Sequence, residues 1–147
     1  MRWTDTLHID APTEEVWQLT TDVERWPSLT PTMRSVARLD DGPLRVGSTA
    51  RVTQPGQSPA IWTVTQLDAG SRFVWQSQRP GMLMVAAHEV TGEAGPDGAA
   101  ACRNTLTLDL TGVVGGLVGR LLTNRLAGML ATENRGFRAA AERRGRA

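Results

Sequence analysis

Two residues of this chain have side chains suited to proton transfer inside a protein, His88 and Glu133. A neutral buried imidazole acts as an acid or base near pH 7. His88 alternates with Ala86 and Val90, so the three share one face of a predicted strand. Glu133 lies near the apolar stripe of a predicted helix, and a carboxylate facing an apolar cavity has a raised pKa. A His88–Glu133 acid–base pair is one hypothesis. The alternative is a histidine satisfied by its neighbours and a glutamate at the polar edge of the helix.

The composition argues against several other chemistries. All 16 basic residues are arginine, so no lysine is present for Schiff-base formation or for a phosphate-binding loop. The chain also lacks tyrosine, and its two histidines and one cysteine have no metal-ligand spacing. The glycine-rich segment 112–119 opens a helix after a predicted antiparallel strand, which does not fit a dinucleotide fingerprint. We therefore predict no metal and no cofactor.

Several apolar residues are suited to holding an apolar molecule. Trp62, Val64 and Gln66 share one face of a predicted strand, which we expect to point inward. Gln66 would then hydrogen-bond a ligand, unless the sheet bends there and Gln66 reaches water. Trp26 follows the first predicted helix, where it either grips a ligand at a cavity mouth or closes the end of the core. Trp75 is predicted to be core or cavity wall.

The hydrophobic pattern predicts the elements that position these residues. Period-two alternation between turn signals predicts strands at 3–10, 33–39, 48–54, 60–67, 72–78, 82–91 and 101–111. After Gly112 the apolar residues recur at three and four, which predicts one long helix to about Arg143, with Arg125 largely off its apolar stripe.

Two short helical segments are predicted between the first two strands. The first spans 13–22, with Thr13 as its N-cap. The second is a turn that ends at Trp26, because Pro27 disfavours helical backbone at the residue before it. Residues 28–32 are accordingly predicted to be a loop.

These elements predict an α+β fold in a single domain, residues 1–147. Six consecutive strands with short turns form an antiparallel meander, and one long helix is available to cover its apolar face. A strongly curved sheet around one helix leaves a space between the two. Such a cavity, lined by apolar side chains, suits an apolar ligand.

Charge and hydropathy indicate a soluble cytoplasmic protein. The net charge of +1 gives no field that would attract nucleic acid. The N-terminal residues lack the apolar core of a signal peptide. Segment 113–131 is apolar, but Arg120 and Arg125 interrupt it, so we predict no stable membrane insertion. The sequence shows no exposed apolar stripe that would favour an interaction module.

The segment APTEEVWQLTTDVERWPSLTPTM resembles the opening of the START-like (SRPBCC) superfamily, the polyketide cyclase/dehydrase and lipid-transport group. The similarity continues through Gly47-Ser48, the pairing of Trp62 with Trp75, Pro96-Asp97-Gly98, Phe137 and Glu142. The resemblance implies the helix-grip (START/Bet v 1-like) fold, a seven-stranded curved antiparallel sheet around a C-terminal helix with a ligand tunnel between them. It does not fix the activity, because the superfamily includes transporters, enzymes and plain binding proteins.

Two functions remain open. The first is binding or carriage of a hydrophobic small molecule, such as a lipid or polyketide. The alternative is a polyketide aromatase/cyclase with His88 as acid or base. Met33 and Gln66 stand where the cyclases that the chain resembles carry a tyrosine and an arginine, which removes two proton donors. The predicted ligand-binding residues are Trp26, Met33, Trp62, Val64, Gln66, Trp75, His88, Leu106 and Met129.

Overall fold

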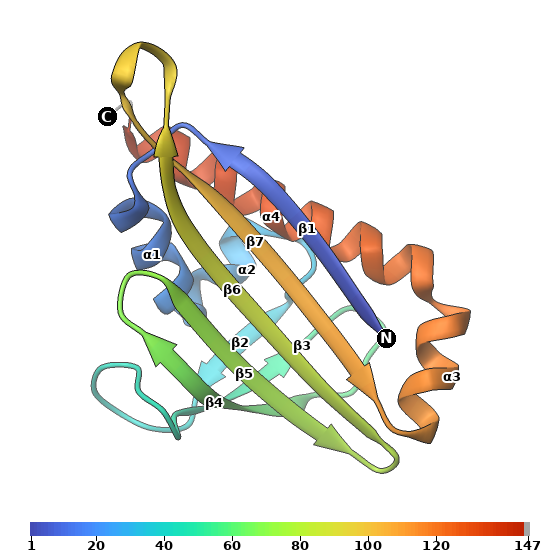
Figure 1. Cartoon of the computed structure of the whole chain (residues 1–147). Coiled ribbons are helices and arrows are strands. Elements are labelled where there is room, and N and C mark those ends of the chain that lie inside the picture. The colour runs from blue at the N-terminus through green and yellow to red at the C-terminus, as the bar shows by residue number, and fades with distance from the viewer. Residues whose placement is uncertain (146–147) are drawn as a thin grey trace.

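A computed structural model describes residues 1–145 as a curved antiparallel sheet with helices on one face (Figure 1). The strands are β1 Arg2–Ile9, β2 Ser35–Arg38, β3 Thr49–Thr53, β4 Ala60–Asp68, β5 Arg72–Arg79, β6 Met82–Ala94 and β7 Ala100–Thr111. The helices are α1 Thr13–Thr21, α2 Trp26–Leu29, α3 Val113–Leu121 and α4 Thr123–Gly145, with single 3-10 turns at Val23–Arg25 and Pro96–Gly98. Residues 146 and 147, the end of the predicted domain, lie outside the described residues.

The sheet order is β1-β7-β6-β5-β4-β3-β2, with every neighbouring pair antiparallel. The six strands β2 to β7 form the predicted meander, and β1 joins its far edge beside β7. In Figure 1, α4 runs along the face behind β1 and β7, and α1 and α2 lie behind the same sheet. Leu106 and Leu110 are buried on this face, as their alternation indicates. The predicted helix-grip fold is confirmed.

The C-terminal region differs from the single helix predicted after Gly112. The helix breaks at Leu122, whose backbone has φ −114° and ψ 18°. Glycines 115 and 119 are buried against β6 and β1: a Cβ at Gly119 would lie 2.9 Å from the Trp3 ring. Because α3 packs through its glycine face, most of its large apolar side chains point away from the sheet, whereas Val118 packs on the buried cluster around Leu106. Val113, Leu117 and Leu121 are 92%, 59% and 73% exposed, so the expectation of no exposed apolar stripe is wrong. Within residues 1–145 no helix is long and apolar enough to cross a membrane.

The N-terminal helices also depart from prediction. Thr13 is the first residue of α1, and Pro12 is the N-cap without a side-chain hydrogen bond. Trp26 is helical, with φ −53° and ψ −36°, and it opens α2 rather than preceding a loop. Pro27 fits in the first turn of α2, where its missing N–H breaks no hydrogen bond. Complete burial of the Trp26 side chain outweighs the preference of a residue before proline for extended backbone.

A bulge in β4 changes which of its side chains face inward. The register with β5 shifts between Val64 and Gln66, so Gln66 pairs with Val74 and Leu67 pairs with the buried Phe73. The extra residue, Thr65, reverses the alternation beyond it. Gln66 is therefore exposed, and its amide donates to Asp68 at 2.6 Å. The expectation that Gln66 faces a cavity is wrong.

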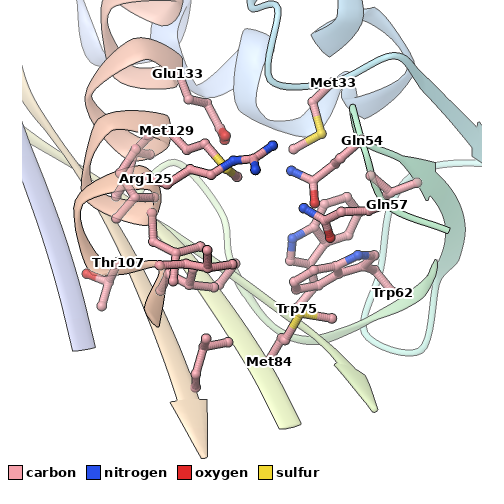
Figure 2. Close-up of a pocket in the computed structure, with 18 of the residues that line it drawn as sticks. Met33, Gln54, Gln57, Trp62, Trp75, Met84, Thr107, Arg125, Met129 and Glu133 are labelled. Carbon is pink, nitrogen blue, oxygen red and sulfur yellow. The ribbon is translucent and has the colours of Figure 1, made fainter. Parts of the chain in front are cut away.

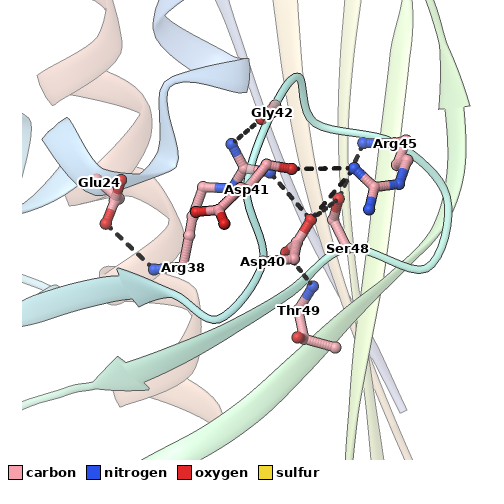
Figure 3. A network of polar contacts seen from close by, with 8 residues as sticks. All are labelled: Glu24, Arg38, Asp40, Asp41, Gly42, Arg45, Ser48 and Thr49. Carbon is pink, nitrogen blue, oxygen red and sulfur yellow. Dashed lines mark hydrogen bonds and ion pairs between the residues drawn. The ribbon is translucent and has the colours of Figure 1, made fainter.

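Asp40 organises the loop between β2 and β3 (Figure 3). Its carboxylate accepts hydrogen bonds from the Thr49 backbone N–H at 3.0 Å, the Ser48 hydroxyl at 2.9 Å and the Arg38 guanidinium at 3.1 Å. These donors, the Thr49 N–H first, lower the pKa of Asp40. The Arg38 backbone N–H donates to Glu24, which ties the helical segment to this edge of the sheet. The network holds β2 and β3 in place at one side of the space under the sheet.

Candidate functional site

A pocket of about 390 Å³ lies between the curved sheet and α4 (Figure 2). Its lining includes residues of two buried apolar clusters, one around Trp26 and Trp75 and the other around Leu106 and Leu126. The predicted ligand-binding residues that line it are Trp26, Met33, Trp62, Trp75, His88, Leu106 and Met129. Val64 does not line it. Val64 is buried in the first cluster, where its backbone hydrogen-bonds Gly47 and Ser48.

Tryptophan rings form one wall of the pocket. Trp62 and Trp75 come from neighbouring strands, with ring centroids 5.4 Å apart and planes tilted by 37°. Trp26 packs edge-on against Trp75 at 5.1 Å and over the imidazole of His88 at 4.8 Å. The indole N–H of Trp26 donates to the Leu19 carbonyl at 3.0 Å, and the side chain is fully buried. Trp26 therefore closes the inner end of the core and is not at a cavity mouth.

His88 and Glu133 meet at the inner end of the pocket. His88 on β6 and Glu133 on α4 are 3% and 6% exposed, and His88 Nε2 lies 3.7 Å from Glu133 Oε1. Burial lowers the pKa of His88 to about 3 and raises that of Glu133 to about 7. The Thr32 hydroxyl donates to the carboxyl group at 3.3 Å and partly opposes its shift. Between these pKa values both groups are neutral, so the pair is not a salt bridge.

This neutral pair offers hydrogen bonds to a guest molecule. The protonated Glu133 carboxyl group is a donor, and the neutral imidazole has one acceptor nitrogen. His88 Nδ1 is buried and has no hydrogen-bond partner among residues 1–145. A buried polar atom without a partner is costly, so a hydroxyl or carbonyl group of a ligand at this end would find unused hydrogen-bonding capacity.

The exposed rim of the pocket carries charged and polar side chains, whereas its walls are mainly apolar. Arg125, near the start of α4, extends across the opening toward Gln54 and Gln57 (Figure 2). Arg79, at the end of β5, lines the same rim and donates to the Ser58 carbonyl at 2.7 Å. The sequence prediction placed Arg125 off the apolar stripe and missed it.

A spacing signal for Arg125 was present in the sequence. Arg125, Met129 and Glu133 are separated by four residues, so they follow one another along a single helix face.

Outside the pocket, His8 is half-exposed on the opposite face of the sheet, between Asp10 and Glu93. Within residues 1–145 no group of three His, Cys, Asp or Glu side chains could hold a metal ion.

A helix-grip sheet with a pocket under its long helix defines a START-like protein. The sequence profile described as "Polyketide cyclase / dehydrase and lipid transport" matches residues 2–142, and the chain belongs to this family. A search of curated proteins found no match.

Solved structures share the fold at low sequence identity. A hypothetical protein, jhp0584 from Helicobacter pylori, superposes with a TM-score of 0.78 at 14% identity, over 96% of this chain and 88% of that one. TTHA0849 from Thermus thermophilus has a TM-score of 0.73 at 17% identity, over 96% and 97%. The di-domain ARO/CYC BexL of the BE-7585A biosynthetic pathway has a TM-score of 0.69 at 19% identity, and the match covers 97% of this chain and 46% of BexL.

Proposed function

We propose that this protein binds an apolar small molecule, such as a lipid, a polyketide or a similar metabolite, in the pocket between the sheet and α4. The observation that carries the proposal is the pocket itself, about 390 Å³ walled by tryptophan, leucine and methionine. Transfer of apolar surface from water into such a space is favourable by roughly 25 cal/mol per Å². Methionines 33, 84 and 129 add flexible side chains, which adapt to ligands of different shape.

A substitution that fills the pocket tests this proposal. Ala86 lies on the inner strand face opposite Trp75 and lines the pocket, whereas its neighbour Val85 points to the other face. We expect A86F to weaken binding of decanol and 2-naphthalenemethanol at least tenfold, because the added ring occupies their space. The matched variant V85F should bind like the parent. Tryptophan fluorescence measures the affinities, and native mass spectrometry of fresh protein detects a co-purified ligand.

Thermal melts followed by circular dichroism check that both variants fold. If the parent binds neither probe and carries no co-purified molecule, the proposal is wrong. Equal affinity of A86F and the parent would place binding outside this pocket.

The His88–Glu133 pair favours a second candidate function, cyclisation of a poly-β-ketone chain. In such a step His88 takes a proton from the carbon between two carbonyls, a carbon–carbon bond forms to another carbonyl of the same chain, and Glu133 protonates the resulting alkoxide. Proton exchange with water restores both groups. We expect H88Q to abolish formation of the cyclic product, followed by liquid chromatography and mass spectrometry, while decanol still binds. An unchanged rate in H88Q would remove His88 from the reaction.

A further inference from the structure

We propose that the ligand carries an anionic group, and that Arg125 and Arg79 bind this group at the rim of the pocket. The inference rests on the proposed function and specifies its ligand class. The two arginines come from different elements, α4 and β5, and both lie against the loop between β3 and β4. Arg79 donates to the Ser58 carbonyl at 2.7 Å, and an Arg125 nitrogen lies 3.6 Å from the position of a Cβ on Gly56. The two guanidinium groups therefore flank one short stretch of the rim.

No carboxylate among residues 1–145 neutralises these two arginines by an ion pair, whereas Arg2 and Arg72 pair with Asp109 and Glu89 on the outer face of the sheet. The acid that lines the pocket is Glu133, which is buried at the inner end and is neutral below about pH 7. The rim is thus positively charged, and its remaining polar groups include the amides of Gln54 and Gln57. Such a set of donors favours an anion over a neutral or cationic group.

Guanidinium groups bind carboxylate, phosphate and sulfate oxygens through paired N–H donors. The inner part of the pocket disfavours charge, since burial there keeps His88 and Glu133 both uncharged between about pH 3 and pH 7. A ligand with one charged group would consequently place it at the rim and its apolar body along Trp62 and Trp75. The ligand class that fits is a single-headed amphiphile with an acidic head.

Three probes with the same apolar chain test this assignment: decanoate, decyl phosphate and decanol, each used below its micelle concentration. At low salt we expect the parent to bind at least one anion about tenfold more tightly than decanol. R125Q should reduce this preference to about twofold, chiefly because the anion binds more weakly. R135Q removes the same charge from an exposed position of α4 outside the pocket and should keep the preference. Because the rim is exposed, the preference should shrink as salt is raised to 0.5 M.

The outcomes separate the inference from the function on which it rests. If decanol binds as tightly as both anions, the anionic assignment is wrong while the apolar pocket stands. If none of the three probes binds, the proposed function fails. An equal loss in R125Q and R135Q would show a general charge effect and overturn the role of Arg125. Preference for decanoate or for decyl phosphate identifies which acidic head the rim selects.

Discussion

At the scale of single residues, the inner end of the pocket holds two ionisable groups, and as pH rises their titrations change the stability of the fold in opposite directions. Glu133 has a folded pKa of about 7 against 4.5 for the ordinary group, so between these values the folded protein keeps a proton and stability falls as pH rises. His88 has a folded pKa of about 3 against 6.5, so over that interval stability rises with pH. Between pH 4.5 and 6.5 the two slopes oppose each other and largely cancel.

Glu133→Gln should remove the Glu133 titration, so that the contribution of His88 to the pH dependence of stability can be measured. Relative to the parent, we expect the free energy of unfolding of E133Q to increase between pH 4.5 and 7, by about 1 kcal/mol for each pH unit. Glutamine retains an oxygen that accepts from Thr32, so the substitution removes the titration with little change in shape. Urea unfolding at pH 5, 6 and 7 measures the difference, with the exposed Glu89→Gln variant as control. Parallel pH profiles of E133Q and the parent would contradict the raised pKa of Glu133.

At the scale of elements, two interior glycines of α4, Gly128 and Gly136, lie in opposite surroundings. A Cβ at Gly136 would clash with the carbonyl oxygen of Leu29, at the end of α2, and would lie 3.3 Å from the Cβ of Thr30. A Cβ at Gly128 would meet no atom within 4 Å. Gly136 therefore allows α4 to approach the end of α2 closely. Gly128 has no comparable packing role.

Alanine at the two positions should act in opposite directions. We expect G128A to stabilise the protein by up to about 1 kcal/mol through helix propensity alone. The same propensity gain applies to G136A, but the clash with backbone should make that variant less stable by about 2 kcal/mol. Urea denaturation of both variants gives the comparison. Similar stabilisation by both would show that α2 and α4 are not in close contact.

The bulge in β4 and the helix break at Leu122 could not be predicted from the sequence. The alternation of Trp62, Val64 and Gln66 is regular in the sequence, yet one extra residue at Thr65 turns Gln66 outward. Nothing in the residue types between 60 and 67 marks the bulge. The break at Leu122 is also hidden, because the apolar spacing continues across it. Its cause is tertiary, since the glycines of α3 pack closely against strands that are distant in sequence.

At the scale of the whole molecule, the pattern predicted the sheet and the order of the strands, and the resemblance of the N-terminal segment and later motifs implied the family. Alternation and turn residues are local signals, and they sufficed for all seven strands to within a few residues. The pocket followed from a physical argument about one helix covering a curved sheet. Arg125 was missed because an apolar stripe locates the core, whereas a rim residue lies at its margin. The sequence left Trp26 open between a cavity mouth and the end of the core, and His88 open between a cavity acid or base and a histidine satisfied by its neighbours. The structure shows both side chains buried and which neighbours they contact.

The pairing of β1 with β7 has a consequence for how the chain is made. Arg2 and Asp109, which bond across these strands, are 107 positions apart. During synthesis on the ribosome, the first strand emerges long before its partner and before α4, so Trp3 and Ile9 have nothing to cover them for most of translation. The space between the sheet and α4 cannot form until α4 has been translated, and until then chaperones can bind the uncovered apolar residues of β1.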